Sequence, residues 1–223
     1  MSVAGKGPSS GDPGENRIAY PRESTEFNRV VALTDGIYAI AMTLLVLTIG
    51  IPRVEPEGLG EELKSIDGEL LTYLISIAVL AYYWLSNHRF VRHLKAMDPV
   101  YTGINVVYLA VVAFLPLPTA LLDRYSSEPI TVVVYLVTLL LISLLEVALF
   151  IWAHHRRLLK GDPSPRAVRY GLTVALAPVL VFGLAIPVGL MTSSTLALAA
   201  WILINFPISI LIERRLGPDS DYF

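Results

Sequence analysis

The chain has 223 residues, of which 54% are hydrophobic and 16% are charged, with a mean hydropathy of +0.61 and a formal net charge of −2. A soluble domain is typically about 45–50% apolar and about 25% charged, so this composition indicates an integral membrane protein. The lack of cysteine excludes disulfides, thiolate metal sites and cysteine nucleophiles. No basic run or aromatic-basic motif points to a nucleic-acid partner.

Several apolar runs are long enough to cross a hydrocarbon core of about 30 Å. Most are apolar all round, and none alternates polar and apolar residues as a barrel strand does. The sequence therefore predicts an all-α protein with six transmembrane helices per chain, at 30–51, 69–87, 100–121, 129–153, 167–190 and 194–212.

The domain organisation follows from these spans. We expect a flexible cytoplasmic tail over residues 1–28, which lacks the apolar region of a secretory signal and is rich in Gly, Pro and Ser. The transmembrane domain should occupy residues 29–215, followed by a short cytoplasmic tail over 216–223.

Basic residues predict the topology. Of the 17 Lys and Arg residues, all but Arg53, Lys64 and Arg124 flank the spans on one side. The positive-inside rule places that side, with both termini, in the cytoplasm. An even number of spans also requires the termini to share a side, so we expect a multi-pass protein of the plasma (inner) membrane.

Polar side chains within the spans are candidates for function, because they are expensive in hydrocarbon. They are Asp35, Thr43, Asn105, Glu146 and Asn205. The sequence has no metalloprotease helix motif, nucleophile elbow, dinucleotide fingerprint or P-loop. We therefore expect neither an enzyme nor a bound cofactor.

The end of the fourth span carries a second group of polar residues. His154 and His155 are adjacent, so they point about 100° apart on a helix and do not suit one metal ion. With Arg156 and Arg157 they indicate a basic cytoplasmic cap. Glu146 lies about two turns inside that cap, and two interpretations stay open: a carboxylate paired with a base or hydroxyl, or a proton relay.

The first span has two different faces. At about 100° per residue, one narrow stripe collects apolar side chains that can face a pore, a partner or lipid: Ile40, Leu44, Leu47 and Ile51, with Thr43 at the edge. Asp35 lies about 140° from this stripe, so the carboxylate and the stripe must serve different purposes.

Asp35 needs hydrogen-bond donors, because an unpaired carboxylate in hydrocarbon costs about 2.5–3.5 kcal/mol. Arg29 is six residues earlier, about 240° round the helix, which is not the spacing of a helical ion pair. The donors should come from other helices, and the side chains available at that depth are Trp84, His88 and Asn105.

Three stretches in order resemble the transmembrane protein 175 family of potassium channels. The first-helix pattern R-x-x-x-L-T-D, from Arg29 to Asp35, resembles the family's Arg-x-x-x-Phe-Ser-Asp, and YYWLSNHRF resembles its Trp-x-x-His-His-Arg type of stretch, with Asn87 in the first His place and His88 in the second. MDPVYTGINVVYLAVVAFLPLPTALL then resembles its third helix. The resemblance covers about residues 27–122.

The resemblance implies a homotetramer of single six-helix chains around the first helix, without a TVGYG filter, which this sequence lacks. It implies a hydrophobic constriction at Ile40, five residues after Asp35, with Leu44 and Leu47 above and Thr43 nearby. It also implies a polar network that holds the first helix, made of Arg29, Asp35, Trp84, His88, Asp98 and Asn105.

The predicted function is passive conduction of K⁺ through this homotetrameric pore, with lipid and K⁺ as the only other partners. Two alternatives stay open. A secondary transporter or proton-coupled exporter would use Asp35 or Glu146 and helices broken at Pro178, Pro187 and Pro207. A membrane scaffold without transport is the other.

Overall fold

Apolar helices make up the protein, as the sequence predicts. The computed structural model describes residues 19–50, 67–125, 127–161 and 163–191, and the sixth predicted span lies outside them. Within these ranges, five stretches are long and apolar enough to cross a membrane. They are α1 (Thr25–Leu45) continued by the 3-10 turn η1 (Val46–Thr48), α3 (Asp67–Arg92), α4 (Pro99–Phe114) with α5 (Pro116–Arg124), α6 (Pro129–His155), and α7 (Pro165–Met191).

Helix starts are set by caps and prolines. Ser24 accepts a hydrogen bond from the backbone of Phe27 (3.2 Å) and caps α1, and Asp98 caps α4 through the backbone of Tyr101 (2.7 Å). A proline, which lacks the N–H that the first turn leaves unpaired, is the first residue of α4, α5, α6 and α7.

The second and third spans differ from the expected ones. The helix α3 runs to Arg92, so Arg89 and Arg92 lie in its last turn instead of a loop. Positive side chains there interact favourably with the helix C-terminus and reach out of the hydrocarbon. The third span is divided at Leu115, because Pro116 has no N–H to continue the α4 ladder.

The first helix starts and ends earlier than expected. It begins at Thr25, and its α-helical part stops at Leu45. The Thr48 hydroxyl donates to the Leu45 carbonyl (2.7 Å), which favours the tighter 3-10 turn that follows. The predicted stripe is therefore α-helical through Leu44, Leu47 lies in the 3-10 turn, and Ile51 is outside the described residues.

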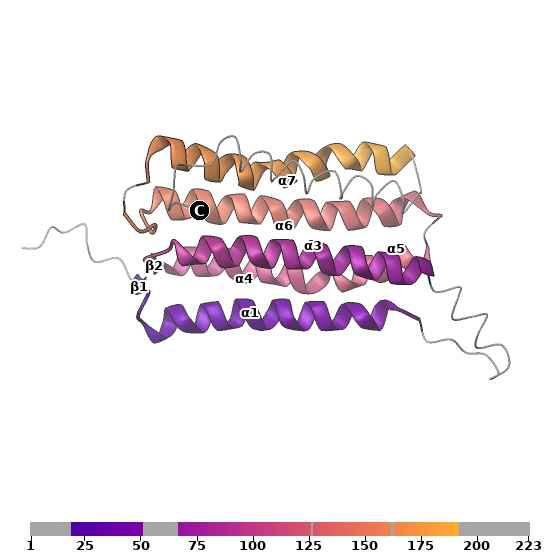
Figure 1. Ribbon diagram of the computed structural model, residues 1–223, viewed down its shortest axis with the longest axis horizontal. Coiled ribbons are helices and arrows are strands. Elements are labelled where there is room, and N and C mark those ends of the chain that lie inside the picture. Colours follow the sequence, from indigo (N-terminus) through magenta and orange to yellow (C-terminus); the bar gives the residue numbers. More distant parts are fainter. Residues whose placement is uncertain (1–18, 51–66, 126, 162, 192–223) are drawn as a thin grey trace, which may run out of the picture.

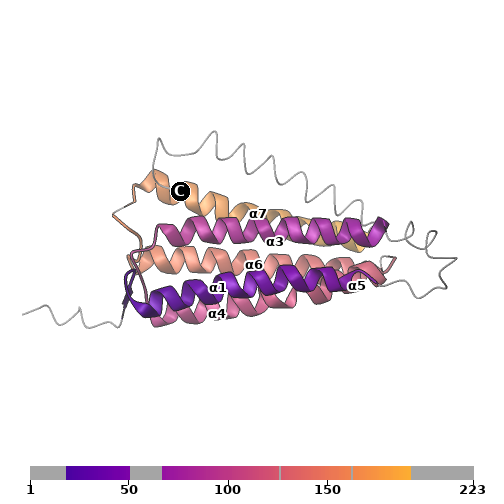
Figure 2. The same cartoon turned by 60° about the horizontal axis from the view of Figure 1, so that its bottom comes forward.

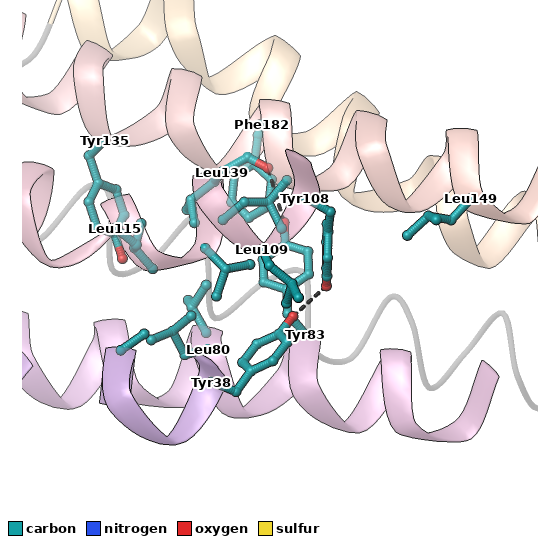
Figure 3. Packing of buried hydrophobic residues seen from close by; sticks show 14 of the residues in the cluster. Tyr38, Leu80, Tyr83, Tyr108, Leu109, Leu115, Tyr135, Leu139, Leu149 and Phe182 are labelled. Carbon is teal, nitrogen blue, oxygen red and sulfur yellow. Dashed lines mark hydrogen bonds between the residues drawn. The ribbon is translucent and has the colours of Figure 1, made fainter. Parts of the chain in front are cut away.

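The helices form a bundle. In Figure 1, α1 and α7 lie on opposite sides, with α3, α4 and α6 between them, and Figure 2 shows α1 beside α4. The helix α4 packs against both α1 and α6, whereas α7 packs mainly against α6. The core between them is rich in tyrosine (Figure 3). Its fully buried tyrosines are Tyr38, Tyr83, Tyr101, Tyr108 and Tyr135.

Three backbone segments meet at one end of the bundle and form what we call the strand platform, residues 20–24, 93–97 and 157–160. The strand β1 (Tyr20–Pro21) pairs antiparallel with β2 (Ala96–Met97). The Lys95 N–H donates to the Leu158 carbonyl (2.9 Å), and Lys160 N–H donates to the His93 carbonyl (2.8 Å). The platform joins the segment before α1 to both connections at this end.

Arg22 fastens the first of these segments. Its guanidinium donates to the carbonyls of Val91 (3.0 Å) and Leu94 (3.0 Å) at the end of α3. The C-terminus of a helix carries unpaired carbonyls and partial negative charge, which a guanidinium satisfies. Residues 20–24, placed in the tail by sequence, are thus bonded to the bundle.

Candidate functional site: the two faces of the first helix

One face of α1 is covered by the rest of the chain. Phe27, Thr34, Tyr38, Ala41 and Leu45 are all buried, with at most 5% of each residue exposed. Their spacing of seven, four, three and four residues follows the helical repeat. This face holds α1 against α3, α4 and α5.

The opposite face of α1 is bare. Ile40 is 54% exposed, Leu44 41% and Leu47 75%. The Thr43 hydroxyl at the edge of this stripe donates to the Ile40 carbonyl of its own helix (2.8 Å). Because that hydroxyl is satisfied locally, the stripe presents an apolar surface that is available to lipid, to a second subunit or to a water-poor pore.

Asp35 is bonded to α3. The Trp84 indole Nε1 donates to Asp35 Oδ1 (3.0 Å), and the His88 ring lies against that indole with ring centres 5.4 Å apart. The three side chains link the first and second predicted spans. Asp35 and Arg29 form no ion pair with each other, and Arg29 is exposed on α1.

Asn105 forms a separate contact with α1. Its amide nitrogen donates to the Thr34 hydroxyl (3.1 Å), which donates to the Val30 carbonyl (2.9 Å). Asn105 and Thr34 are 3% and 5% exposed. A threonine in the Ser place of the family motif therefore keeps a bonded hydroxyl. Asn87 lines a small gap between this contact and Asp35.

Asp98 lies in a third cluster, which does not include Asp35. The Trp152 indole donates to Asp98 Oδ1 (3.0 Å), and Arg156 Nε forms an ion pair with Oδ2 (3.3 Å). The carboxylate thus fixes the start of α4 against the end of α6. Sequence reasoning named Arg156 only as part of the basic cap and did not name Trp152, although their spacing of four residues places both on one face of a helix.

Glu146 is joined to the first helix through two tyrosines. The Tyr108 hydroxyl donates to Glu146 Oε1 (3.3 Å), and the hydroxyls of Tyr38 and Tyr108 are hydrogen-bonded to each other (Figure 3). This chain of three side chains crosses from α6 through α4 to α1. The tyrosines were not predicted, although Tyr108 follows Asn105 by three residues and so shares its face of α4.

The six predicted network residues are therefore distributed over separate contacts. Asp35, Trp84 and His88 form one group, Asn105 binds Thr34, Asp98 binds α6, and Arg29 stands apart. In the part of the chain that the structure describes, no three His, Asp or Glu side chains are arranged to hold a metal ion.

Comparisons with known proteins support the resemblance. The family profile described as endosomal/lysosomal potassium channel TMEM175 matches residues 29–116. A protein of Streptomyces collinus named as a potassium channel is 32% identical over 172 residues, which cover 68% of this chain and 82% of that protein. A protein of Chamaesiphon minutus, also named as a potassium channel, is 38% identical over 48% of this chain, and the match spans about half of that relative (54%).

Solved structures agree with this relationship. The crystal structure of a lysosomal potassium-selective channel TMEM175 homologue from Chamaesiphon minutus superposes with a TM-score of 0.71 at 26% identity, covering 87% of this chain and 100% of that one. The potassium channel MtTMEM175 has the same fold, with a TM-score of 0.60 at 19% identity over 90% of this chain and 96% of that one. The profile match, the Streptomyces relative and the shared fold together show that the chain belongs to the TMEM175 family.

Proposed function

We propose that the protein is a passive K⁺ channel, a homotetramer in which α1 of each chain lines a central pore. The observation that carries the proposal is the division of α1 into a buried packing face and a bare apolar face. Tyr38 and Ala41 are at most 1% exposed, whereas Ile40, between them, is 54% exposed. Relatives named as potassium channels support the choice of ion.

The constriction is assigned to Ile40, with Leu44 and Leu47 above it and Thr43 at its edge. Four isoleucine side chains around an axis would form a ring too narrow and too dry for a hydrated ion, and such hydrophobic constrictions gate by dewetting. K⁺ loses first-shell water at lower cost than Na⁺. The selectivity should be modest, because no oxygen cage replaces the lost water.

The polar residues then have a supporting role, off the path of the ion. Asp35 with Trp84 and His88, Asn105 with Thr34, and Asp98 at the α4–α6 junction position the helices behind the pore. Arg29, exposed near the start of α1, belongs to the same proposed support. The strand platform and both termini lie on the cytoplasmic side of the plasma membrane in this arrangement.

Conduction is tested with the substitution Ile40→Asn in protein reconstituted into liposomes. An amide in each of four chains hydrates the ring, so K⁺ conductance should rise and the K⁺/Na⁺ preference should fall, measured by reversal potentials in K⁺/Na⁺ gradients. Val107→Asn is the matched control, because Val107 on α4 is also 54% exposed. Equal flux and selectivity in the two variants would contradict the pore assignment.

Assembly is tested separately by crosslinking and mass measurement in mild detergent, where we expect four chains. A stable monomer would overturn the channel, because one chain cannot enclose the proposed pore. A pH gradient applied to the same liposomes distinguishes K⁺ conduction from proton-coupled exchange through Asp35 or Glu146, since passive K⁺ flux needs no proton gradient.

A further inference from the structure

A cavity of about 120 Å³ lies between α3, α6 and α7. This exceeds the roughly 30 Å³ that a water molecule occupies in the liquid. It lies in the half of the bundle nearest the strand platform, because its walls come from the last turns of α3 and the second turn of α7. The residues that matter for its chemistry are Ser86, Asn87, Arg89, Glu146, Gly171 and Ala175.

A carboxyl group and a guanidinium group line this cavity at different depths. Glu146 is partly buried and receives the hydrogen bond from Tyr108. Among the described residues, no Lys, Arg or His lies within 4.0 Å of its carboxylate. Arg89 is exposed and follows Ser86 by three residues, about one turn nearer the end of α3. The cavity therefore has a carboxylate at its floor and a guanidinium at its mouth.

This order of charges matches a small dipolar group that enters with its cationic end first. A primary ammonium has three donors, and three residues that line the cavity, Ser86, Asn87 and Glu146, carry side-chain oxygens that can accept hydrogen bonds. A phosphate group behind the ammonium would meet Arg89, whose planar fork suits phosphate oxygens. A quaternary ammonium cannot donate these hydrogen bonds and is bulkier.

The depth of the site favours a membrane lipid as the source of this group. Ser86 lies six residues, about 9 Å, from the end of α3, close to the inner edge of the headgroup layer, which adds about 5–8 Å on each side of the hydrocarbon core. Apolar side chains continue beyond the cavity on α3 and α7, where Leu85 is 46% exposed and Leu180 63%. These provide a surface along which acyl chains can lie.

We propose that the cavity binds the headgroup of a lipid with a primary ammonium and a phosphodiester, such as phosphatidylethanolamine, with the ammonium at Glu146 and the phosphate at Arg89. The site is separate from the Ile40 stripe. It is connected to the first helix through the Tyr108–Tyr38 hydrogen bonds and through Asn87, which also lines the gap beside Asp35. Its occupancy does not depend on which ion the pore conducts.

The test measures lipid retention on the full chain by native mass spectrometry after exchange with equimolar phosphatidylethanolamine and phosphatidylcholine of identical acyl chains. Wild-type protein should retain phosphatidylethanolamine about three- to tenfold better. Glu146→Gln should remove this preference, and Arg89→Gln should weaken retention of both lipids. Glu128→Gln is the control, since Glu128 is exposed at the start of α6, at the other end of the helix.

Ala175→Leu is a second variant, which fills the cavity without changing its charge and should also abolish the preference. Gel filtration of each variant checks that the assembly is intact. Equal retention of the two lipids by the wild type, or an unchanged preference in Glu146→Gln, would overturn the proposal. Competition by soluble glycerophosphoethanolamine would support the headgroup contacts, whereas binding of the soluble compound without any lipid preference would exclude the lipid as the source.

Discussion

The helices α1 and α6 are both apolar, but they are buried in the protein to different extents. In the most apolar stretch of α1 only 22% of residues are buried, whereas 50% are buried in that of α6. The helix α6 contacts α4, α5 and α7, and its buried positions include Leu139 and Ile142. It is the packed centre of the chain.

The helix α1 has fewer buried positions, and polar contacts to other helices add to its packing, as they also do in α6. It is bonded through Asp35 to α3, through Thr34 and Tyr38 to α4, and its start is joined to the strand platform. Helix association in lipid gains little from apolar burial, since lipid tails are as apolar as leucine. A helix with one bare face can therefore be positioned by a few hydrogen bonds without a wide packing surface.

The largest loss of stability should come from a substitution that disrupts the close packing of α6. Leu139→Ala removes a side chain that is fully buried, and we expect it to lower the free energy of unfolding by about 2 kcal/mol or more, from lost van der Waals contacts and the cavity left behind. Leu47→Ala, at a position that is 75% exposed, should change it by less than about 0.5 kcal/mol. The measurement is reversible unfolding in mixed micelles. Similar losses in both variants would show that the two helices are held alike.

A smaller loss of stability should follow when one hydrogen bond of α1 is removed. Tyr38→Phe keeps the ring but removes the hydroxyl that bonds Tyr108, and we expect a loss of about 0.5–1.5 kcal/mol, the range for polar contacts between membrane helices. Tyr125→Phe serves as the control, because Tyr125 is 47% exposed outside the core. If Tyr38→Phe behaves like this control, hydrogen bonding does not position α1 and the contrast with α6 fails.

The features that the sequence predicts are those that depend on the residues of a single segment. The apolar runs predicted every span that the structure describes, because length and hydropathy suffice to place a helix in hydrocarbon. The division of α1 into two faces also follows from the helical repeat, so the stripe containing Ile40 and the position of Asp35 away from it could be drawn without coordinates.

The contacts between segments could not be derived in the same way. Trp84 was one of several donors open to Asp35, and only the packing of α1 on α3 selects it. The partners Trp152 of Asp98 and Tyr108 of Glu146 come from helices whose relative rotation the sequence leaves open. The break at Pro116 had a local signal, the missing N–H, but the overall hydropathy of the third span concealed it.

The smallest expected change in stability is a pH dependence at the strand platform, which joins the start of α1 to the bundle. Partial burial and the nearby charges of Arg92, Lys160 and Arg22 lower the pKa of His93 below its ordinary value of 6.5. The folded protein therefore binds a proton at His93 less readily than the unfolded chain does. Above the unfolded pKa neither state is protonated, and His93 does not reduce the stability of the protein. Stability declines as the pH falls through about 6.5 toward the lower folded pKa.

Acidification should therefore loosen the platform slightly, because a proton on His93 adds positive charge beside Arg22 and Lys160. The melting temperature in detergent should fall between about pH 7.5 and pH 5.5 by more in the wild type than in His93→Gln, which cannot take up that proton. His154→Gln, at an exposed position, should leave the wild-type pH dependence unchanged. An identical pH dependence in wild type and His93→Gln would mean that His93 does not sense pH. The contacts of Asp35, Thr34 and Tyr38 with α3 and α4 do not involve the platform.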